Sequence, residues 1–287
     1  MIIGTRGSAL AMEQTNIFIN ALLNDGISSS EYIVKEVRVS GDVDQISPLH
    51  ELQGFGAFVR ELDDALLKGT IDVSVNSMKD MPIKSRPGII IPAILPRGDV
   101  RDVVLPGSLD ELDEGSTIGT SSLRRSATIR RTRPDLVIKP LRGNIQTRMR
   151  KLDEGEYDAI ILAKAGLDRM GIDLPYAVLD VEDMVPAPAQ GAIAIACREN
   201  DTEIVELLSK IDDLRTREEV TLERAIMEAT GAGCTSPIGI NASLQGDCFT
   251  LCAESFISDL PVKFTRTIRR TYSEDEVNAM AKELRGL

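Results

Sequence analysis

Histidine and tryptophan are nearly missing from this 287-residue chain, which has one histidine and no tryptophan. A Ser-His-Asp or Cys-His catalytic arrangement could rest only on His50, which follows Pro48 in a loop-like stretch and is expected at the surface. One histidine also excludes a histidine-rich metal site. Acid–base chemistry in this protein must therefore use carboxylates, lysine or water.

Long apolar runs are also missing, since none approaches the roughly 18 to 20 residues that a membrane span needs. Residues 1–6 (MIIGTR) lack a basic region followed by an apolar core, so no signal peptide is expected. Four cysteines in a chain of this length do not indicate a disulfide scaffold. We expect a cytoplasmic protein with reduced thiols and no membrane association.

Positive charges are outnumbered, since 33 lysines and arginines stand against 45 acids and give a formal net charge of −12, and this argues against nonspecific nucleic-acid binding. Between residues 120 and 150, however, eight arginines and Lys139 stand against a single acid, Asp135. Such a run can be a solvated basic helix face, or it can bind an anionic ligand. Arginine favours the second interpretation, because its guanidinium group fits carboxylate or phosphate.

Short apolar runs alternate with helical spacing in the first two thirds of the chain, a βαβ rhythm that predicts a mainly parallel sheet covered by helices. The expected strands are 2–3, 32–39, 71–75, 117–119, 136–138 and 159–163, and the expected helices are 8–23, 58–67, 122–131 and 145–152. Residues 87–115, rich in proline and glycine, separate two such α/β units. Crossovers near 92–97 and 186–190 would place a cleft between them.

The pattern changes near Arg215. A long helix (215–229), three strands (240–244, 250–255 and 262–271) and a last helix from Ser273 predict a small α+β domain. The predicted domains are 1–94 with 190–212 for the first, 98–186 for the second, and 215–287 for the third.

Cys234 stands in a glycine-rich turn, residues 231–239 (GAGCTSPIG). Glycines permit positive φ and leave space around the sulfur, so this thiol is placed to react, although a purely structural turn is also possible. Cys197, Cys248 and Cys252 lie in apolar, strand-like surroundings and are expected to be small core residues. No second close pair or histidine completes a metal site, so no metal is expected.

Polar residues follow the strand that ends near Val75, and Lys79 and Asp80 are among them. In open α/β sheets the carboxyl ends of the strands are where ligands bind, although a solvated turn before Pro82 is an equal alternative. Residues 119–125 (GTSSLRR), 141–148 (LRGNIQTR) and 4–8 (GTRGS) are three further loops of this kind. Their small hydroxyl residues and arginines would suit an anion at a helix start.

These motifs together resemble the porphobilinogen deaminase (hydroxymethylbilane synthase) family, in order across nearly the whole chain. They are residues 5–8 (TRGS), 77–82 (SMKDMP), 119–125 (GTSSLRR), 141–144 (LRGN) with 147–148 (TR), 155–159 (GEYDA) through 165–167 (AGL) with Arg169, 186–191 (PAPAQG), and 233–239 (GCTSPIG). The resemblance implies two α/β domains like periplasmic binding proteins around a cleft, plus the small C-terminal domain.

The resemblance also implies the chemistry. A dipyrromethane cofactor would be joined covalently through Cys234, and four porphobilinogen molecules would lose ammonia in turn and extend it. Hydrolysis would then release linear hydroxymethylbilane. Each pyrrole ring carries an acetate and a propionate, which fits an arginine-rich site in an acidic protein.

By resemblance, Asp80 is the catalytic residue, whose carboxylate stabilises the positive charge that develops as ammonia leaves. The residues that match cofactor- or substrate-binding positions are Arg6, Ser8, Lys79, Thr120, Ser121, Ser122, Arg124, Arg125, Arg142, Arg148 and Arg169. No metal, nucleic acid or membrane is implied as a partner, and a monomer is expected.

Some residues depart from the family pattern. Asn76 stands where histidine is common, and Ala189 replaces a common glycine. Residues 54–56 (GFG) form a loop that usually contains lysine, and Arg60 can stand for the lysine that usually follows this loop. Two rival functions remain: a two-lobed solute-binding protein without catalysis, and a nucleic-acid binder using residues 120–150. The first needs no Cys234, and the second lacks interleaved aromatic residues.

Overall fold

The computed structural model describes residues 1–27, 31–39, 59–233 and 236–287. The predictions for His50, for residues 54–56 and for Cys234 therefore lie outside the described residues. The described chain forms two compact units. Unit 1 consists of the described residues before Asp99 together with Gly191–Arg217, and unit 2 of Asp99–Gln190 together with the described part of Glu218–Leu287.

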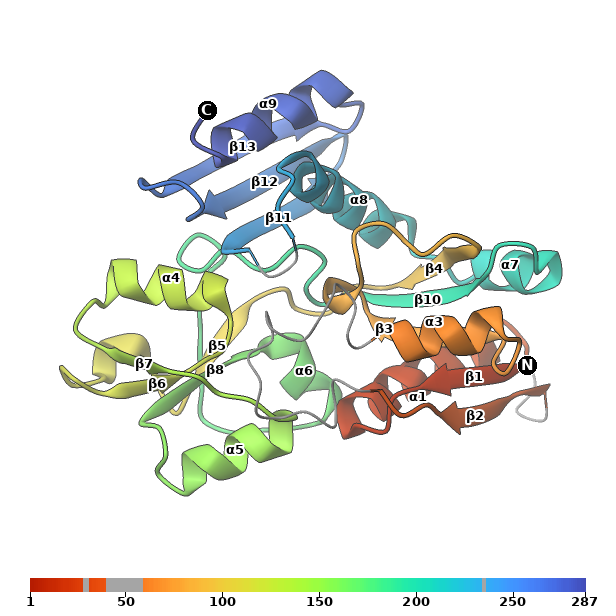
Figure 1. Ribbon diagram of the computed structural model, residues 1–287, viewed down its shortest axis with the longest axis horizontal. Helices are drawn as coiled ribbons and strands as arrows, with labels where there is room; N and C mark the ends of the chain where they lie inside the picture. Colours follow the sequence, from red (N-terminus) through yellow and green to blue (C-terminus); the bar gives the residue numbers. More distant parts are fainter. Residues whose placement is uncertain (28–30, 40–58, 234–235) are drawn as a thin grey trace. The chain divides into compact units, whose positions relative to one another are not determined.

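Unit 1 contains a five-stranded sheet (Figure 1). Its strands, in spatial order, are β2 (Ile33–Glu36), β1 (Ile2–Thr5), β3 (Val73–Ser77), β10 (Ile193–Arg198) and β4 (Ile89–Leu95). β1 runs parallel to β2 and β3, whereas β10 is antiparallel to both β3 and β4. The prediction of a mainly parallel sheet is thus correct for the β2-β1-β3 half and wrong for the other half. β10 enters this sheet only after the chain has passed through residues 99–190, and it runs opposite to its neighbours.

The described residues of unit 1 form the helices α1 (Ala9–Asn24), α3 (Arg60–Leu67) and α7 (Thr202–Ser209), and one turn of 3₁₀ helix, η2 (Met78–Asp80), follows β3. α1 starts at Ser8, whose side chain accepts a hydrogen bond from Ala11 N at 3.3 Å. Phe18 and Leu22 of this helix are fully buried against Ile3, Val75 and other residues of the sheet. This packing fixes the position of the loop between β1 and α1.

Unit 2 contains a second five-stranded sheet with the same mixed directions. Its strands, in spatial order, are β7 (Val137–Lys139), β6 (Thr117–Gly119), β8 (Ala159–Ala163), β5 (Asp102–Leu105) and β9 (Ala177–Val178). β6 is parallel to β7 and β8, and β5 is antiparallel to β8 and β9. The helices are α4 (Leu123–Thr132), α5 (Ile145–Asp153) and α6 (Lys164–Arg169), with a 3₁₀ turn, η3 (Leu109–Glu111).

The C-terminal part of unit 2 is a small antiparallel sheet of three strands, β11 (Ile238–Gln245), β12 (Cys248–Ser255) and β13 (Val262–Arg269). α8 (Leu214–Ala229) precedes this sheet and α9 (Glu274–Leu284) follows it, as Figure 1 shows in teal for α8 and in blue for the sheet and α9. The expected fold class, two α/β parts with a small α+β C-terminal part, is confirmed. The three domain boundaries stay a prediction.

Glycine is required at position 239 by close packing. A Cβ atom there would lie 2.4 Å from the backbone oxygen of Val185. The neighbouring Ile240 N donates to Pro186 O at 2.9 Å, which draws β11 against residues 185–186. The glycine of the 237–239 motif therefore serves the packing of unit 2.

Residues 87–115 were expected to be a connecting segment, and this prediction is wrong. They contain β4 and β5, and β5 is buried along its whole length. Pro92 concealed β4, because proline is disfavoured in sheets. It is tolerated here because β4 is an edge strand whose pairing with β10 shifts register between Ile195 and Cys197.

The cysteine predictions are mostly confirmed. Cys197 and Cys252 are buried, and burial raises the pKa of both thiols, that of Cys197 to about 11. Cys248 is only half-buried at the start of β12, so its assignment to the core is wrong.

Asp63 of α3 is a buried acid, 7% exposed, and burial raises the pKa of its carboxyl from 3.8 to about 6. Because the folded state holds this proton more tightly than the unfolded state, the group costs stability as pH rises through this interval, and the cost is complete above pH 6. Asp63→Asn should therefore raise the free energy of unfolding at pH 7 by about 1–3 kcal/mol. The gain should shrink as the pH falls to 4, as urea titrations at both pH values would show.

Asp64→Asn is the matched control. Asp64 is ion-paired with Arg86, and this hydrogen bond lowers the pKa of its carboxyl, so its loss should slightly destabilise the protein at pH 7. An Asp63→Asn protein that is less stable than wild type at pH 7 would contradict the assignment.

Candidate functional site

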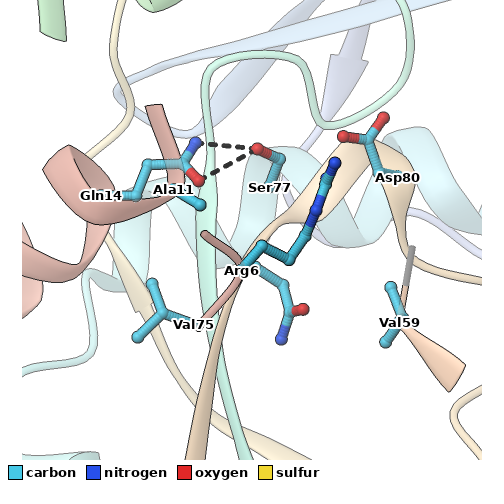
Figure 2. Close-up of a pocket in the computed structure, with 8 residues that line it drawn as sticks. Arg6, Ala11, Gln14, Val59, Val75, Ser77 and Asp80 are labelled. Carbon is cyan, nitrogen blue, oxygen red and sulfur yellow. Dashed lines mark hydrogen bonds between the residues drawn. The ribbon is translucent and has the colours of Figure 1, made fainter. Parts of the chain in front are cut away.

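A small polar pocket lies in unit 1, where β1 and β3 end (Figure 2). Arg6 follows β1, and Asp80 closes the η2 turn that follows β3. Because β1 and β3 are parallel neighbours, their carboxyl ends meet at one edge of the sheet. The lining residues are Arg6, Ala11, Gln14, Val59, Val75, Asn76, Ser77 and Asp80.

Asp80 is exposed to solvent, and Figure 2 shows the side chain of Arg6 extending toward its carboxylate. Lys79, the preceding residue, is half-buried. A carboxylate and a guanidinium group at one opening can act on a substrate that loses a cationic group and carries an anionic one. Arg6 and Asp80, both candidate site residues, line this one pocket.

Gln14 of α1 fixes the hydroxyl group of Ser77 in this pocket. Gln14 Nε2 donates to Ser77 Oγ at 2.8 Å, and Ser77 Oγ donates to Gln14 Oε1 at 3.1 Å (Figure 2). Asn76, where histidine is common in the family, donates from Nδ2 to Ser74 Oγ at 2.9 Å. Gln14 was not predicted from the sequence, because a buried glutamine in a helix has no local signal that distinguishes it from a surface residue.

In unit 2, the hydroxyl residues that precede α4 build the loop itself. Ser121 Oγ donates to Leu141 O at 2.9 Å and accepts from Leu141 N at 3.0 Å, which ties the loop before α4 to the loop after β7. Ser122 Oγ accepts from Arg125 N at 3.4 Å and caps α4. Thr120 is buried, and its backbone N donates to Lys139 O at 3.0 Å. The Arg125 amide, one of the helix-start groups expected to remain for an anion, is therefore used within the protein.

Arg124 and Arg125 are both buried, and both contact Asp102 at the start of β5. Arg124 Nη2 lies 2.7 Å from Asp102 Oδ2, and Arg125 Nη2 lies 2.7 Å from Asp102 Oδ1. Burial alone would raise the pKa of Asp102, but the two guanidinium groups outweigh it and hold that pKa well below its ordinary value. The sequence predicted these arginines as ligand contacts and gave no sign of Asp102.

A third group of cations lies around the loop 141–144. Asn144 caps α5 by accepting from Thr147 N at 2.9 Å, and Arg148 Nε donates to Gly143 O at 2.8 Å. Gly143 has a φ of 109°, and a Cβ atom there would lie 2.6 Å from the Thr147 side chain. The tight turn at Gly143 thus sets the direction of Arg142.

Arg142 Nη1 is a buried donor without a hydrogen-bond acceptor among the residues that the structure describes, and Arg124 Nε is another. An unpaired buried N–H group is costly, and a ligand with carboxylates would satisfy both atoms. Arg169 ends α6, and burial lowers the pKa of its guanidinium to about 10. Unit 2 is therefore suited to a ligand with several negative charges.

Comparison with known proteins identifies the family. The family model described as porphobilinogen deaminase, dipyromethane cofactor binding domain, matches residues 1–206. The chain belongs to the porphobilinogen deaminase family. A probable porphobilinogen deaminase from Methanosarcina acetivorans is 47% identical over 251 residues, 86% of this chain and 78% of the relative.

Two further relatives in the porphobilinogen deaminase family extend the match. The porphobilinogen deaminase of Lysinibacillus sphaericus is 44% identical over 93% of this chain and 88% of its own length. A probable porphobilinogen deaminase from Archaeoglobus fulgidus is 39% identical over 99% of this chain and 97% of its own length. The likeness therefore includes the C-terminal part that the family model does not cover.

Among solved structures, the second substrate binding domain of a putative amino acid ABC transporter from Streptococcus pneumoniae superposes with a TM-score of 0.43. It is 14% identical and covers 80% of this chain and 94% of its own. None of the helices in the described ranges has the length and apolar character that a membrane span requires. The described residues also contain no cluster of histidine, cysteine and acidic side chains that could hold a metal ion.

Arg125→Leu tests the buried cluster of unit 2. It removes two hydrogen bonds to the Asp102 carboxylate and one to Ile161 O, and leaves a buried charge with fewer partners. The free energy of unfolding should fall by about 3–5 kcal/mol, measured by urea titration. Arg150→Leu is the control: its ion pair with Glu154 is exposed, and its loss should cost less than about 1 kcal/mol. Equal stabilities of the two variants would refute the buried cluster.

Proposed function

We propose that this chain is a hydroxymethylbilane synthase, a transferase that condenses four porphobilinogen molecules with release of ammonia and then frees linear hydroxymethylbilane. The observation that carries the proposal is the position of Asp80 beside Arg6, at the carboxyl ends of β1 and β3, in a chain of the porphobilinogen deaminase family.

Asp80 acts as the catalytic carboxylate. As ammonia leaves the substrate, positive charge spreads over the pyrrole ring, and a fixed carboxylate beside it stabilises that charge and accepts the pyrrole N–H proton. Arg6 and Lys79 bind the acetate and propionate of the substrate, since a charge-assisted hydrogen bond to a carboxylate is among the stronger polar contacts. The hydroxyl group of Ser77, held by Gln14, keeps this side of the pocket polar and rigid.

A dipyrromethane cofactor is bound through Cys234. When bound, it supplies the pyrrole carbon on which the product is built. Two of the other three cysteines support this assignment by contrast, because Cys197 and Cys252 are buried thiols of raised pKa and therefore poor nucleophiles. Cys234 has the glycine-rich turn that they lack.

The arginine-rich loops of unit 2 hold the carboxylates of the cofactor and of the growing chain. The unpaired buried donors Arg142 Nη1 and Arg124 Nε support this role. The residues assigned to it, with Ser8 on unit 1, are Thr120, Ser121, Ser122, Arg124, Arg125, Arg142, Arg148 and Arg169. A monomer in the cytoplasm, acting without nucleic acid, stays a prediction.

The covalent cofactor predicts a mass. Wild-type protein should weigh more than its polypeptide by two pyrrole units, and Cys234→Ser should have the bare polypeptide mass, measured by intact-protein mass spectrometry. Cys248→Ser, half-buried at the start of β12, is the control and should keep the added mass. An active wild-type preparation without added mass would contradict the proposal of a covalent cofactor.

Asp80→Asn should fold and keep the cofactor but lose turnover, because the amide cannot accept a proton or balance positive charge. We expect kcat for ammonia release to fall by about 100-fold or more, with the added mass unchanged. Asp25→Asn, an exposed residue at the end of α1, is the control and should keep the wild-type rate. A wild-type rate in the Asp80 variant would remove Asp80 from the mechanism.

A further inference from the structure

Asp102 carries no assigned role, yet its carboxylate accepts hydrogen bonds from both Arg124 and Arg125. Its side chain is 0% exposed, between arginine side chains that are 5% and 8% exposed. Oδ1 accepts from Arg125 Nη2 at 2.7 Å, and Oδ2 accepts from Arg124 Nη2 at 2.7 Å and from Arg125 Nε at 3.2 Å. One carboxylate therefore orients both guanidinium planes.

The backbone completes the orientation of the two arginines. Arg124 Nη1 donates to Val185 O at 2.7 Å, and Arg125 Nη1 donates to Ile161 O at 3.0 Å. Each guanidinium group has five N–H donors, so these bonds leave further donors on both residues. Arg124 Nε is one of them, and it is buried without an acceptor in the described part of the chain. The donors that face Asp102 are thus bonded to its carboxylate, whereas further N–H donors of the two arginines remain for an anion.

Stability alone does not account for such a cluster. Replacing a buried ion pair or triad by well-packed apolar residues is often neutral or stabilising. Two neighbouring arginines on the first turn of α4 also oppose the helix dipole and repel each other. A carboxylate between them allows two adjacent cations to be held in one fixed arrangement, which is what recognition of several carboxylates requires.

Asp102 is also joined to the segments where the chain enters and leaves unit 2. Oδ1 accepts from Gln190 Nε2 at 2.8 Å, and the same nitrogen donates to Val100 O at 2.7 Å. Gln190 is 1% exposed and is the last residue before the chain returns to unit 1. The residue before it, Ala189, has a φ of 60°, the left-handed region that favours glycine. Asp102 therefore couples the arginine pair to both crossovers.

We infer that Asp102 is a positioning residue for cofactor binding: its buried carboxylate holds Arg124 and Arg125 in the arrangement that receives the carboxylates of the dipyrromethane, and it locks this arrangement to the crossover at Gln190. The inference rests on the proposed function. The side chain of Asp102 is fully buried, and it acts through the two arginines.

Asp102→Asn is the direct test. Asparagine keeps the shape of the side chain but presents an amide N–H group where a guanidinium donor needs an acceptor. Glu223→Gln is the matched control: Glu223 is also 0% exposed, accepts from Ala189 N at 2.6 Å and Ala242 N at 2.8 Å, and is likewise a buried acid of unit 2. Both variants lose one buried charge, so both should have lower thermal midpoints than wild type.

Intact mass separates positioning from a purely structural role. The fraction of folded molecules that carry the two pyrrole units should fall about tenfold or more in Asp102→Asn. A tenfold change is about the effect of losing one charge-assisted hydrogen bond. Glu223→Gln should keep the wild-type fraction despite its lower thermal midpoint. Equal cofactor fractions in the two variants would overturn the inference.

Asp102→Glu decides the matter if the asparagine variant does not fold. Glutamate keeps the charge that the buried arginines need but moves the carboxylate by one methylene. The KM for porphobilinogen should rise about tenfold while kcat changes much less, because the displaced arginines bind carboxylates and Asp80 is untouched. An unchanged KM with a full cofactor fraction would overturn the inference. Failure of the proposed function would look different, since wild type itself would then lack the added mass.

Discussion

The buried carboxylate of Asp102 is the constraint on which the arrangement of the arginines in unit 2 depends. Two adjacent arginines cannot be buried unless an anion neutralises them, and Asp102 lies within 2.7 Å of each. Once this contact forms, α4 is tied to β5, to β8 through Ile161 O and to residue 185. These contacts fix the orientation of two neighbouring guanidinium groups inside an acidic protein.

In unit 1, a sheet of the same kind brings an arginine and a carboxylate to one pocket. β1 and β3 are parallel, so the loops after them meet at one edge and bring Arg6 and Asp80 to a shared opening. α1 then fixes the floor of the pocket, because its buried face supplies Gln14 to Ser77. The carboxylate of Asp80 is exposed to solvent, whereas the carboxylate of Asp102 in unit 2 is fully buried.

The sequence pattern predicted those strands and helix starts that are set by neighbouring residues, such as short apolar runs and capping serines. The strands 117–119 and 159–163 were predicted residue for residue, and Ser8 and Ser273 were placed at the starts of their helices. Pro92 and the proline- and glycine-rich run around it concealed β4 and β5, because edge position and register shift are properties of the folded sheet. Asp102 was missed for a related reason: it is an acid at the start of an apolar strand, and its partners lie 22 and 23 residues away. Cys234 and the loop 54–56 lie outside the described residues and stay predictions.

The claim that arginine loops and Asp80 serve stepwise growth of a covalently held chain has one direct test. Wild-type protein is mixed with limiting porphobilinogen, quenched in acid and weighed intact. The account predicts a ladder of discrete species above the resting mass, each separated from the next by one pyrrole unit, and no ladder when Asp80 is asparagine. A single unchanged mass, in a protein that nevertheless binds porphobilinogen, would contradict it and would favour a binding protein without catalysis.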